Sequence, residues 1–219
     1  MRNDRFAVCG TWLLAAVLLP VQVFAQAGAP MGEALPEAGV LQEIWTGIRG
    51  NGVAELTGHR SYKGLPREAR ILGALRVDSQ MDNFGARYSA LVIPPKDGED
   101  TFWIASDDNS ELWLGTDEEE ANLAKIASVG GYTGREAWDA TKSQKSKAVA
   151  LKEGARYLLR AFHKDGGGDD HVAVAWSGPG LPRAVLDSTY LRVPKLSPKT
   201  ATLVQKIRAE EKHRAELLA

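Results

Sequence analysis

The chain has 219 residues, of which 27 are basic and 28 are acidic, so its formal net charge at pH 7 is −1. This balance provides neither the basic surface that nucleic acid requires nor a polybasic patch for acidic lipids. The single cysteine, Cys9, lies in an N-terminal segment that we expect to be removed. The mature chain is therefore predicted to lack disulfides, a catalytic thiol and a cysteine-based zinc site.

Residues 1–25 have the pattern of a secretory signal peptide. Arg2 and Arg5 precede an apolar run at 6–19, and Val23-Phe24-Ala25 offers a small-residue cleavage site. The run is too short and too early for a membrane span, so we expect none in the mature chain. The protein is therefore predicted to be secreted or to reside in the cell envelope. Residues 26–40, rich in Ala, Gly and Pro, are predicted to be a disordered leader.

Residues 41–193 contain many short strand-like runs separated by turn residues, which predicts one all-β domain, an antiparallel β-sandwich or barrel. The expected strands are 41–48, 70–77, 88–93, 101–105, 111–115, 147–151, 155–163, 171–177 and 185–193. Two hairpins are predicted, one with its tip at 107–110 and one that turns at Glu153-Gly154. We expect loops at 51–69 and 128–146 and one short helix within 117–127.

Residues 194–219 are predicted to form a linker and a charged C-terminal helix. Leu203 and Ile207 give this helix a thin apolar stripe among many charged residues. Such a helix could pack on the sandwich, dock a protein partner or remain a solvated tail. The thin stripe favours the solvated tail, because it would bury little area.

Two loops are rich in carboxylates, at 106–110 (Ser-Asp-Asp-Asn-Ser) and at 165–170 (Asp-Gly-Gly-Gly-Asp-Asp). Each alone is ordinary turn chemistry. Together, at one end of a sandwich, they could supply most of the six to eight oxygen ligands that Ca²⁺ takes. Successive side chains of a strand leave on opposite faces. Asp107 and Asp108 can therefore reach one ion only where the backbone bends, bulges or contains a cis peptide.

The run Thr-Phe-Trp-Ile-Ala-Ser-Asp-Asp-Asn-Ser-Glu-Leu-Trp-Leu-Gly at 101–115 resembles the signature of the protective-antigen ("PA-fourteen") domain family, which occurs in fungal flocculins, bacterial adhesins and some glycosidases. Residues 94–98, 151–157 and 166–180 agree in order, and Trp45-Thr46-Gly47 resembles the opening strand. The resemblance covers about residues 41–191. It implies a β-sandwich or barrel and, in the sugar-binding branch, a Ca²⁺ ion held by paired aspartates, often across a cis peptide.

Carried onto this chain, the resemblance implies Asp107 and Asp108 as the first ligands and Asp170 from the second loop, with Asp165 and Asp169 as lesser candidates. Vicinal sugar hydroxyls would take the open coordination positions. The residues expected to contact the sugar are Asn109, Tyr132, Trp138, Gly167, Gly168 and His171. His171 departs from the pattern, because related members carry an oxygen-bearing side chain there and imidazole is a poor ligand for a hard cation. His163 is expected to be polar surface.

The sequence thus predicts a secreted, calcium-dependent carbohydrate-binding module that is not an enzyme. Its paired carboxylates would be committed to the ion, and it has no Gly-x-Ser-x-Gly elbow, no His-Glu-x-x-His and no phosphate loop. Two alternatives remain. One is a structural or assembly domain of the cell envelope with a purely structural ion, and the other is an accessory module of a separate hydrolase.

Overall fold

The computed structural model describes residues 36–218. The predicted signal peptide and residues 26–35 of the predicted leader lie outside this range. The strands are β1 (Val40–Thr46), β2 (Glu68–Leu72), β3 (Arg76–Ser79), β4 (Phe84–Val92), β5 (Gly98–Asp107), β6 (Asn109–Leu114), β7 (Ala124–Val129), β8 (Val149–Leu151), β9 (Tyr157–Asp165), β10 (Asp170–Gly178), β11 (Leu181–Val185) and β12 (Leu191–Arg192). The α-helices are α1 (Val53–Gly58) and α2 (Pro198–Leu217).

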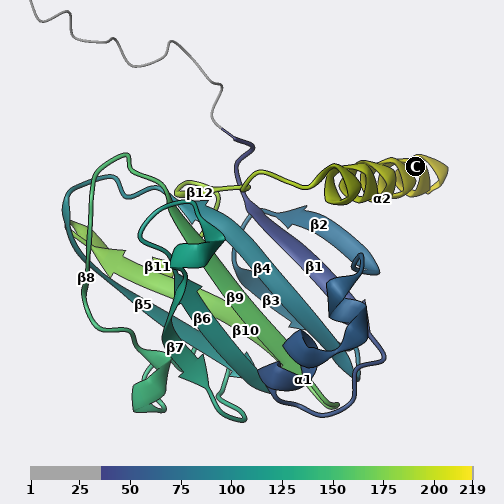
Figure 1. Cartoon of the computed structure of the whole chain (residues 1–219), viewed down its shortest axis with the longest axis horizontal. Helices are drawn as coiled ribbons and strands as arrows, with labels where there is room; N and C mark the ends of the chain where they lie inside the picture. Colours follow the sequence, from purple (N-terminus) through teal and green to yellow (C-terminus); the bar gives the residue numbers. More distant parts are fainter. Residues whose placement is uncertain (1–35, 219) are drawn as a thin grey trace, which may run out of the picture. The chain divides into compact units, whose positions relative to one another are not determined.

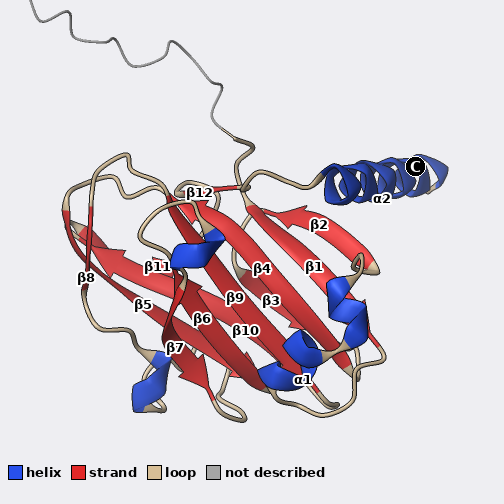
Figure 2. Cartoon of the chain, in the orientation of Figure 1, coloured by secondary structure: helices blue, strands red, loops and turns tan. Residues whose placement is uncertain are grey.

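The strands form two antiparallel sheets (Figure 2). The larger sheet has the order β2-β1-β4-β9-β6-β7, with β12 added to β4, and the smaller one has the order β11-β10-β5-β8, with β3 added to β10. Side chains from both sheets fill one apolar core, among them Phe84, Tyr88, Phe102, Ile104 and Trp176. The all-β sandwich expected from the sequence is confirmed.

The two predicted hairpins are wrong, because in each case the two strands belong to different sheets. β5 pairs with β10 and β8 of the smaller sheet, whereas β6 pairs with β9 and β7 of the larger one. β8 and β9 are divided between the sheets in the same way. Turn residues mark where a chain reverses, but they do not determine which strand each flank pairs with. The acidic turn after β5 therefore crosses from one layer to the other.

Three local expectations also need correction. The predicted loop at 51–69 contains α1, a 3-10 turn (Arg60–Lys63) and the start of β2. The strand expected at 70–77 is two strands in different sheets, β2 and β3. The helix expected within 117–127 is a 3-10 turn (Glu120–Asn122) followed by β7, in which Ala127 and Val129 are buried with the period of two that marks a strand.

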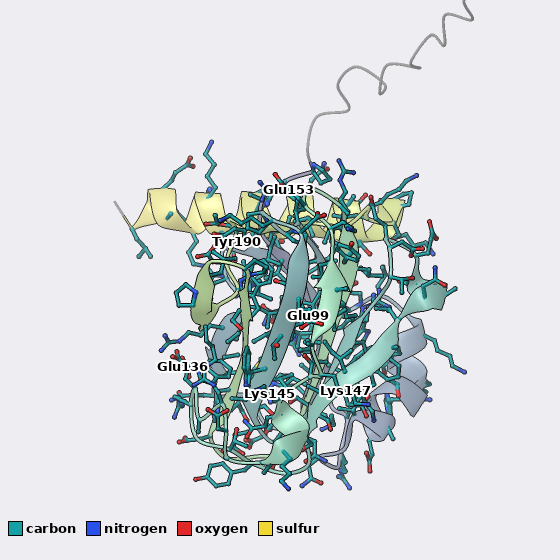
Figure 3. All side chains as sticks on the ribbon, turned by 90° about the vertical axis from the view of Figure 1, so that its left-hand side faces the viewer. Glu99, Glu136, Lys145, Lys147, Glu153 and Tyr190 are labelled. Atoms are coloured by element: carbon teal, nitrogen blue, oxygen red, sulfur yellow. The ribbon has the colours of Figure 1, made fainter. Side chains whose placement is uncertain are left out.

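The three tryptophans of β5, β6 and β10 take different positions. Trp176 lies between the sheets and is 2 % exposed. Trp103 points to the outer face of the smaller sheet. Arg183 lies 5.1 Å from its ring centre, and Lys145, which is labelled in Figure 3, lies 5.4 Å from it. Trp113 is half-buried against a second apolar cluster on the outer face of the larger sheet, beneath α1. Both faces of the sandwich are therefore partly covered.

α2 is not wholly a solvated tail. Ser197 caps it by accepting a hydrogen bond from Thr200 N at 3.1 Å, and Val204 is buried against Leu41 and Ala69 of β1 and β2. Figure 1 shows the helix beside β2. Beyond Ile207 its residues are exposed. Among residues 36–218, no helix combines the length and the apolar character needed to cross a membrane.

Asp100 of β5 makes the free energy of unfolding depend on pH. It is 1 % exposed, neither carboxylate oxygen has a hydrogen-bond partner within residues 36–218, and burial raises its pKa to about 6. A Cβ at Gly178 would lie 2.1 Å from Asp100 Oδ1, so this glycine makes room for the carboxyl group. Because the folded-state pKa exceeds the unfolded value of 3.8, the stabilising contribution is complete below about pH 4 and is lost as pH rises through 6.

Asp100→Asn is therefore expected to remove this loss and to raise the free energy of unfolding at pH 7.5 by up to about 3 kcal/mol, with little effect at pH 4. Urea unfolding at both pH values measures it. Asp97→Asn is the matched control. The pKa of Asp97 is lowered by the Glu153 amide and by Lys152, so its carboxylate stabilises the folded chain. Asp97→Asn should therefore lower the free energy of unfolding at pH 7.5, where Asp100→Asn raises it. An equal stability gain of Asp100→Asn at both pH values would contradict the assignment.

Candidate functional site

Strand pairing brings the two acidic loops to one end of the sandwich. β5 passes to β6 through Asp107-Asp108, and β9 passes to β10 through residues 166–169. β5 pairs with β10, with Asp107 opposite His171, while β6 pairs with β9, with Asn109 opposite Lys164. Each crossing therefore runs between two strands that are paired with the two strands of the other crossing, so the two crossings lie side by side. We call this end of the sandwich the acidic rim, defined by the turn 106–110 and the loop 165–170.

A direct contact joins the loops, because Gly166 N donates to Asp108 Oδ2 at 3.1 Å. The Asp107–Asp108 peptide bond is cis, one of the three arrangements that the sequence left open. From the interior, His163 Nε2 donates to the Asp107 carbonyl at 2.7 Å, and Ser106 Oγ donates to the Asp108 carbonyl at 2.6 Å. The turn is thus held on both carbonyls as well as on one carboxylate.

The second loop depends on glycine. Gly167 and Gly168 have φ values of +158° and +112°, which side-chain-bearing residues rarely adopt. Gly168 N lies 3.4 Å from Asp82 Oδ1, so a further carboxylate borders this loop. Gly167 and Gly168 thus contribute to the rim through their backbone.

Asp165 and Asp170 face each other inside the rim and are fully buried. Asp170 Oδ2 accepts from Met81 N at 2.9 Å, but Asp170 Oδ1 and both Asp165 oxygens receive no N–H or hydroxyl hydrogen within residues 36–218. Burial raises the pKa of Asp170, and the nearby charge of Asp165 raises it further.

Asp107 lies on the more exposed side of the rim. Burial raises its pKa, and the nearby charges of Asp108, Asp165 and Asp169 raise it further, while His171 opposes them. Charges from both acidic loops thus act on Asp107.

The two histidines near the second loop are strand residues and not exposed surface. His163 of β9 is 1 % exposed with its ring edge-on to Phe84, and burial lowers its pKa to about 4. His171 of β10 is also buried, and burial and then Arg135 lower its pKa. The sequence held a signal for His163. It continues the face of β9 that carries Leu159 and Ala161, and that face is the inward one.

The residues expected to contact sugar are distributed along the rim and one neighbouring loop. Asn109 Oδ1 accepts from Gly131 N, and Thr133 N donates to the Ser106 carbonyl at 2.8 Å, so the loop 130–136 is tied to the acidic turn. Tyr132 at its tip is 71 % exposed. Trp138 is half-buried further along the chain.

Sequence reasoning missed Lys164. Its side chain is fully buried, and its Nζ donates to the carbonyl oxygens of Gly50 and Asp165. Burial lowers its pKa, while the charges of Asp165 and Asp108 act to raise it. A buried ammonium group thus lies against the backbone at the start of the second loop.

The oxygen atoms that the rim offers as ligands are of the kind that a hard cation prefers. Its side-chain donors are carboxylates, and the three carboxylate oxygens without a hydrogen donor on Asp165 and Asp170 are the kind of buried group that a cation satisfies. Within the described range, no three His, Cys, Asp or Glu side chains converge so as to hold an ion by themselves. A Ca²⁺ ion here would therefore also need backbone carbonyl oxygens, which this ion commonly takes.

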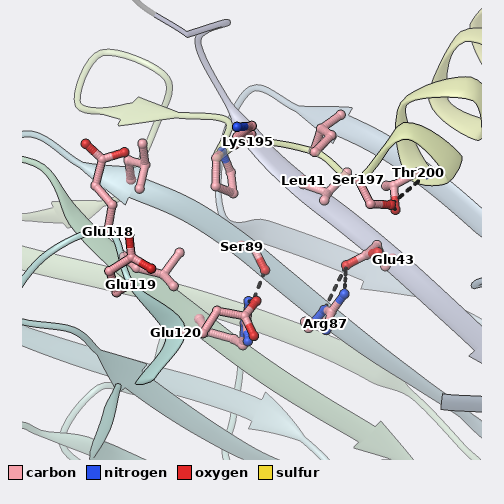
Figure 4. Close-up of a pocket in the computed structure, with 15 residues that line it drawn as sticks. Leu41, Glu43, Arg87, Ser89, Glu118, Glu119, Glu120, Lys195, Ser197 and Thr200 are labelled. Atoms are coloured by element: carbon pink, nitrogen blue, oxygen red, sulfur yellow. Dashed lines mark hydrogen bonds and ion pairs between the residues drawn. The ribbon is translucent and has the colours of Figure 1, made fainter. Parts of the chain in front are cut away.

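A separate hollow of about 450 Å³ lies on the outer face of the larger sheet (Figure 4). Its floor holds the ion pair of Arg87 with Glu43 at 2.7 Å, and Arg160 Nε lies 3.4 Å from Ser89 Oγ. The segment Glu118–Glu120 borders it on one side and the start of α2 on the other. It contains no residue expected from the sequence to act in binding.

The fold and the rim define a class: a two-sheet β-sandwich domain with carboxylate-bearing crossings at one end. The family model of the PA14 domain matches residues 78–189, which are 112 of the 219 residues. The chain belongs to the PA14 domain family.

Two curated proteins are similar to the chain over part of their length. N-acetyl-beta-glucosaminyl-glycoprotein 4-beta-N-acetylgalactosaminyltransferase 1 of Mus musculus is 37 % identical over 151 residues, which are 65 % of this chain and 14 % of the transferase. Fibrocystin of Canis lupus familiaris is 26 % identical over 132 residues, which are 57 % of this chain and 3 % of fibrocystin. The chain thus corresponds to a small part of each relative.

Solved structures share the fold. The PA14 sugar-binding domain from an RTX adhesin has a TM-score of 0.56 at 12 % identity, covering 72 % of this chain and 99 % of that domain. The A domain of epithelial adhesin 6 from Candida glabrata, in complex with Galβ1-3GlcNAc, has a TM-score of 0.55 at 16 % identity, covering 76 % and 91 %. The PA14 domain of the antifreeze protein MpAFP has a TM-score of 0.54 at 14 % identity, covering 78 % and 98 %.

Proposed function

We propose that this chain is an exported carbohydrate-binding module whose binding depends on Ca²⁺. The observation that carries the proposal is the Gly166 N to Asp108 Oδ2 hydrogen bond, because it brings the two acidic loops together at one rim. Membership of the PA14 family and the similarity to sugar-binding adhesin domains support it. Export rests on the signal-peptide pattern of residues 1–25.

In this proposal Asp107 and Asp108 of the turn and Asp170 of the second loop are the candidate ligands, with Asp165 and Asp169 as lesser ones. Backbone carbonyl oxygens would complete the set, because no three of these side chains converge within residues 36–218. Bound Ca²⁺ would supply open coordination positions that accept two neighbouring sugar hydroxyls. The chain's own part is to keep the turn in place through His163 and Ser106 and to keep both loops in contact through Gly166 N.

The residues around the ion would select the glycan. Tyr132 is exposed on a loop tied to the turn, which suits stacking on the apolar face of a sugar ring. Asn109 already accepts the Gly131 amide, so it would act chiefly by fixing this loop. So few groups reach one sugar that single-site binding should be weak, and a millimolar constant is only about −4 kcal/mol. Useful retention would then rest on several copies acting together.

A second candidate is a structural domain without lectin activity. It is favoured by the internal contacts that already hold the rim, above all the hydrogen bonds from Lys164 Nζ to Gly50 and Asp165. In that case any ion would only tie the loops together. The short coverage of both curated relatives also fits a module that serves a larger protein, including an enzyme that the module would target to its substrate. For this chain itself we propose no catalytic step.

A glycan array probed with the mature chain in Ca²⁺, and again in excess chelator, tests the proposal. We expect glycan signals in Ca²⁺ that the chelator removes, and that added Ca²⁺ restores. Retention that is equal in chelator would refute the calcium-dependent module. A melting temperature raised by Ca²⁺ with no glycan retained would establish the structural alternative.

A further inference from the structure

Lys164 is an unusual residue to bury. Lysine is almost never fully buried unless its charge is paired. Here the side chain is 0 % exposed, reaching beneath the loop that follows β1, and Nζ donates to the Gly50 carbonyl and the Asp165 carbonyl. The charge of Glu55 of α1 also acts to raise the pKa of Lys164, against the larger effect of burial.

The position of this ammonium coincides with the contact between the acidic loops. A Cβ placed on Gly166 would lie 3.5 Å from Asp108 Oδ2 and 3.6 Å from the Gly50 carbonyl oxygen, the atom to which Lys164 Nζ donates. Burial lowers the pKa of Lys164, and the charges of Asp165 and Asp108 act to raise it. Both belong to the set that would hold the ion in the proposed function.

We propose that Lys164 is a resident counter-charge of the acidic rim, which lowers the affinity of the rim for Ca²⁺ and makes the ion exchangeable; this inference rests on the proposed function. Two cations at the same rim repel each other, and in partly buried surroundings the repulsion is only weakly screened. The ammonium also donates a hydrogen bond to the Asp165 carbonyl oxygen of the rim when no ion is bound. The affinity then falls toward the range of extracellular calcium modules, about 10⁻⁴–10⁻³ M.

The test is isothermal titration calorimetry with CaCl₂ on the mature chain and on three variants. Lys164→Gln removes the charge and keeps a hydrogen-bond donor, and it should bind Ca²⁺ at least about tenfold more tightly. Lys164→Arg keeps the charge and should remain within about threefold of the wild type. Lys212→Gln removes one charge from the exposed part of α2 and should leave the affinity unchanged.

A measurement on the wild type covers the case in which Lys164→Gln does not fold. The side-chain resonances of Lys164 should shift on titration with Ca²⁺ with the same midpoint as the heat of binding, while those of Lys212 stay in place. A folded Lys164→Gln with unchanged or weaker Ca²⁺ affinity, or Lys164 resonances that do not respond to bound Ca²⁺, would overturn the inference.

These outcomes are separable from those of the proposed function. Wild-type glycan retention that a chelator removes, together with equal Ca²⁺ affinity in Lys164→Gln, would refute the role of Lys164 alone. Ca²⁺ binding by Lys164→Gln but not by the wild type would support the counter-charge and refute calcium dependence in the native chain. Absence of Ca²⁺ binding in all variants would refute both.

Discussion

Asp108→Asn is expected to abolish Ca²⁺-dependent glycan retention while the sandwich remains folded. The asparagine oxygen can still accept the Gly166 amide that Asp108 Oδ2 accepts at 3.1 Å, so the contact between the loops persists. The charge that would hold the ion is lost. Because outer-shell partners of a metal ligand already affect affinity about 10- to 100-fold, loss of a ligand's charge should cost at least about 100-fold.

The matched control for this variant is Asp117→Asn. Asp117 also accepts a backbone amide, from Glu119 N at 2.8 Å, but it lies on the exposed segment after β6, away from the rim. It should bind glycan as the wild type does. Glycan retention on a calibrated surface, together with the melting temperature, measures both effects. Undiminished retention by Asp108→Asn would show that this carboxylate is not part of the site.

The strands of the sandwich were predictable because they carry a local signal. A run such as Tyr88–Val92 or Val172–Trp176 has the composition and the alternation of a strand wherever its partner lies. Pairing carries no such signal. β5 and β6 are separated by one residue, which suggests a hairpin, yet β5 belongs to the smaller sheet and β6 to the larger one. The 117–127 segment was misassigned because Leu123 and Ala127 match a helical spacing by chance over so short a run.

The rim was predictable to the extent that its residues are close in sequence. Asp107 with Asp108 and Asp165 with Asp170 are visible as acidic turns, and the family resemblance joins them. The burial of Lys164 was not predictable, because its ammonium group is held by the carbonyl oxygen of Gly50, 114 residues earlier. In the sequence it stands only as one more charged residue beside a glycine-rich loop.

The buried ion pair between Glu43 of β1 and Arg87 of β4 leads to a second large expected effect. Glu43 is 2 % exposed, and its Oε2 accepts from Arg87 Nε at 2.8 Å and from a second guanidinium nitrogen at 2.7 Å. Arg87 also donates to Tyr62 Oη at 3.2 Å and lies 5.5 Å from the ring centres of both Trp45 and Tyr62. The pair therefore joins the larger sheet to the segment that covers it.

Glu43→Ala is expected to lower the free energy of unfolding by about 3–5 kcal/mol, because it leaves the Arg87 guanidinium largely buried without its carboxylate. Asp139→Ala breaks an equally short pair, 2.8 Å to Arg183, in which both side chains are exposed, and should cost less than about 1 kcal/mol. Urea unfolding measures both. Replacing Glu43 and Arg87 together by Met should recover most of the loss, because the unpaired charge is then removed as well. If the double variant is no more stable than Glu43→Ala, the cost lies in lost packing and the stranded arginine is not its cause.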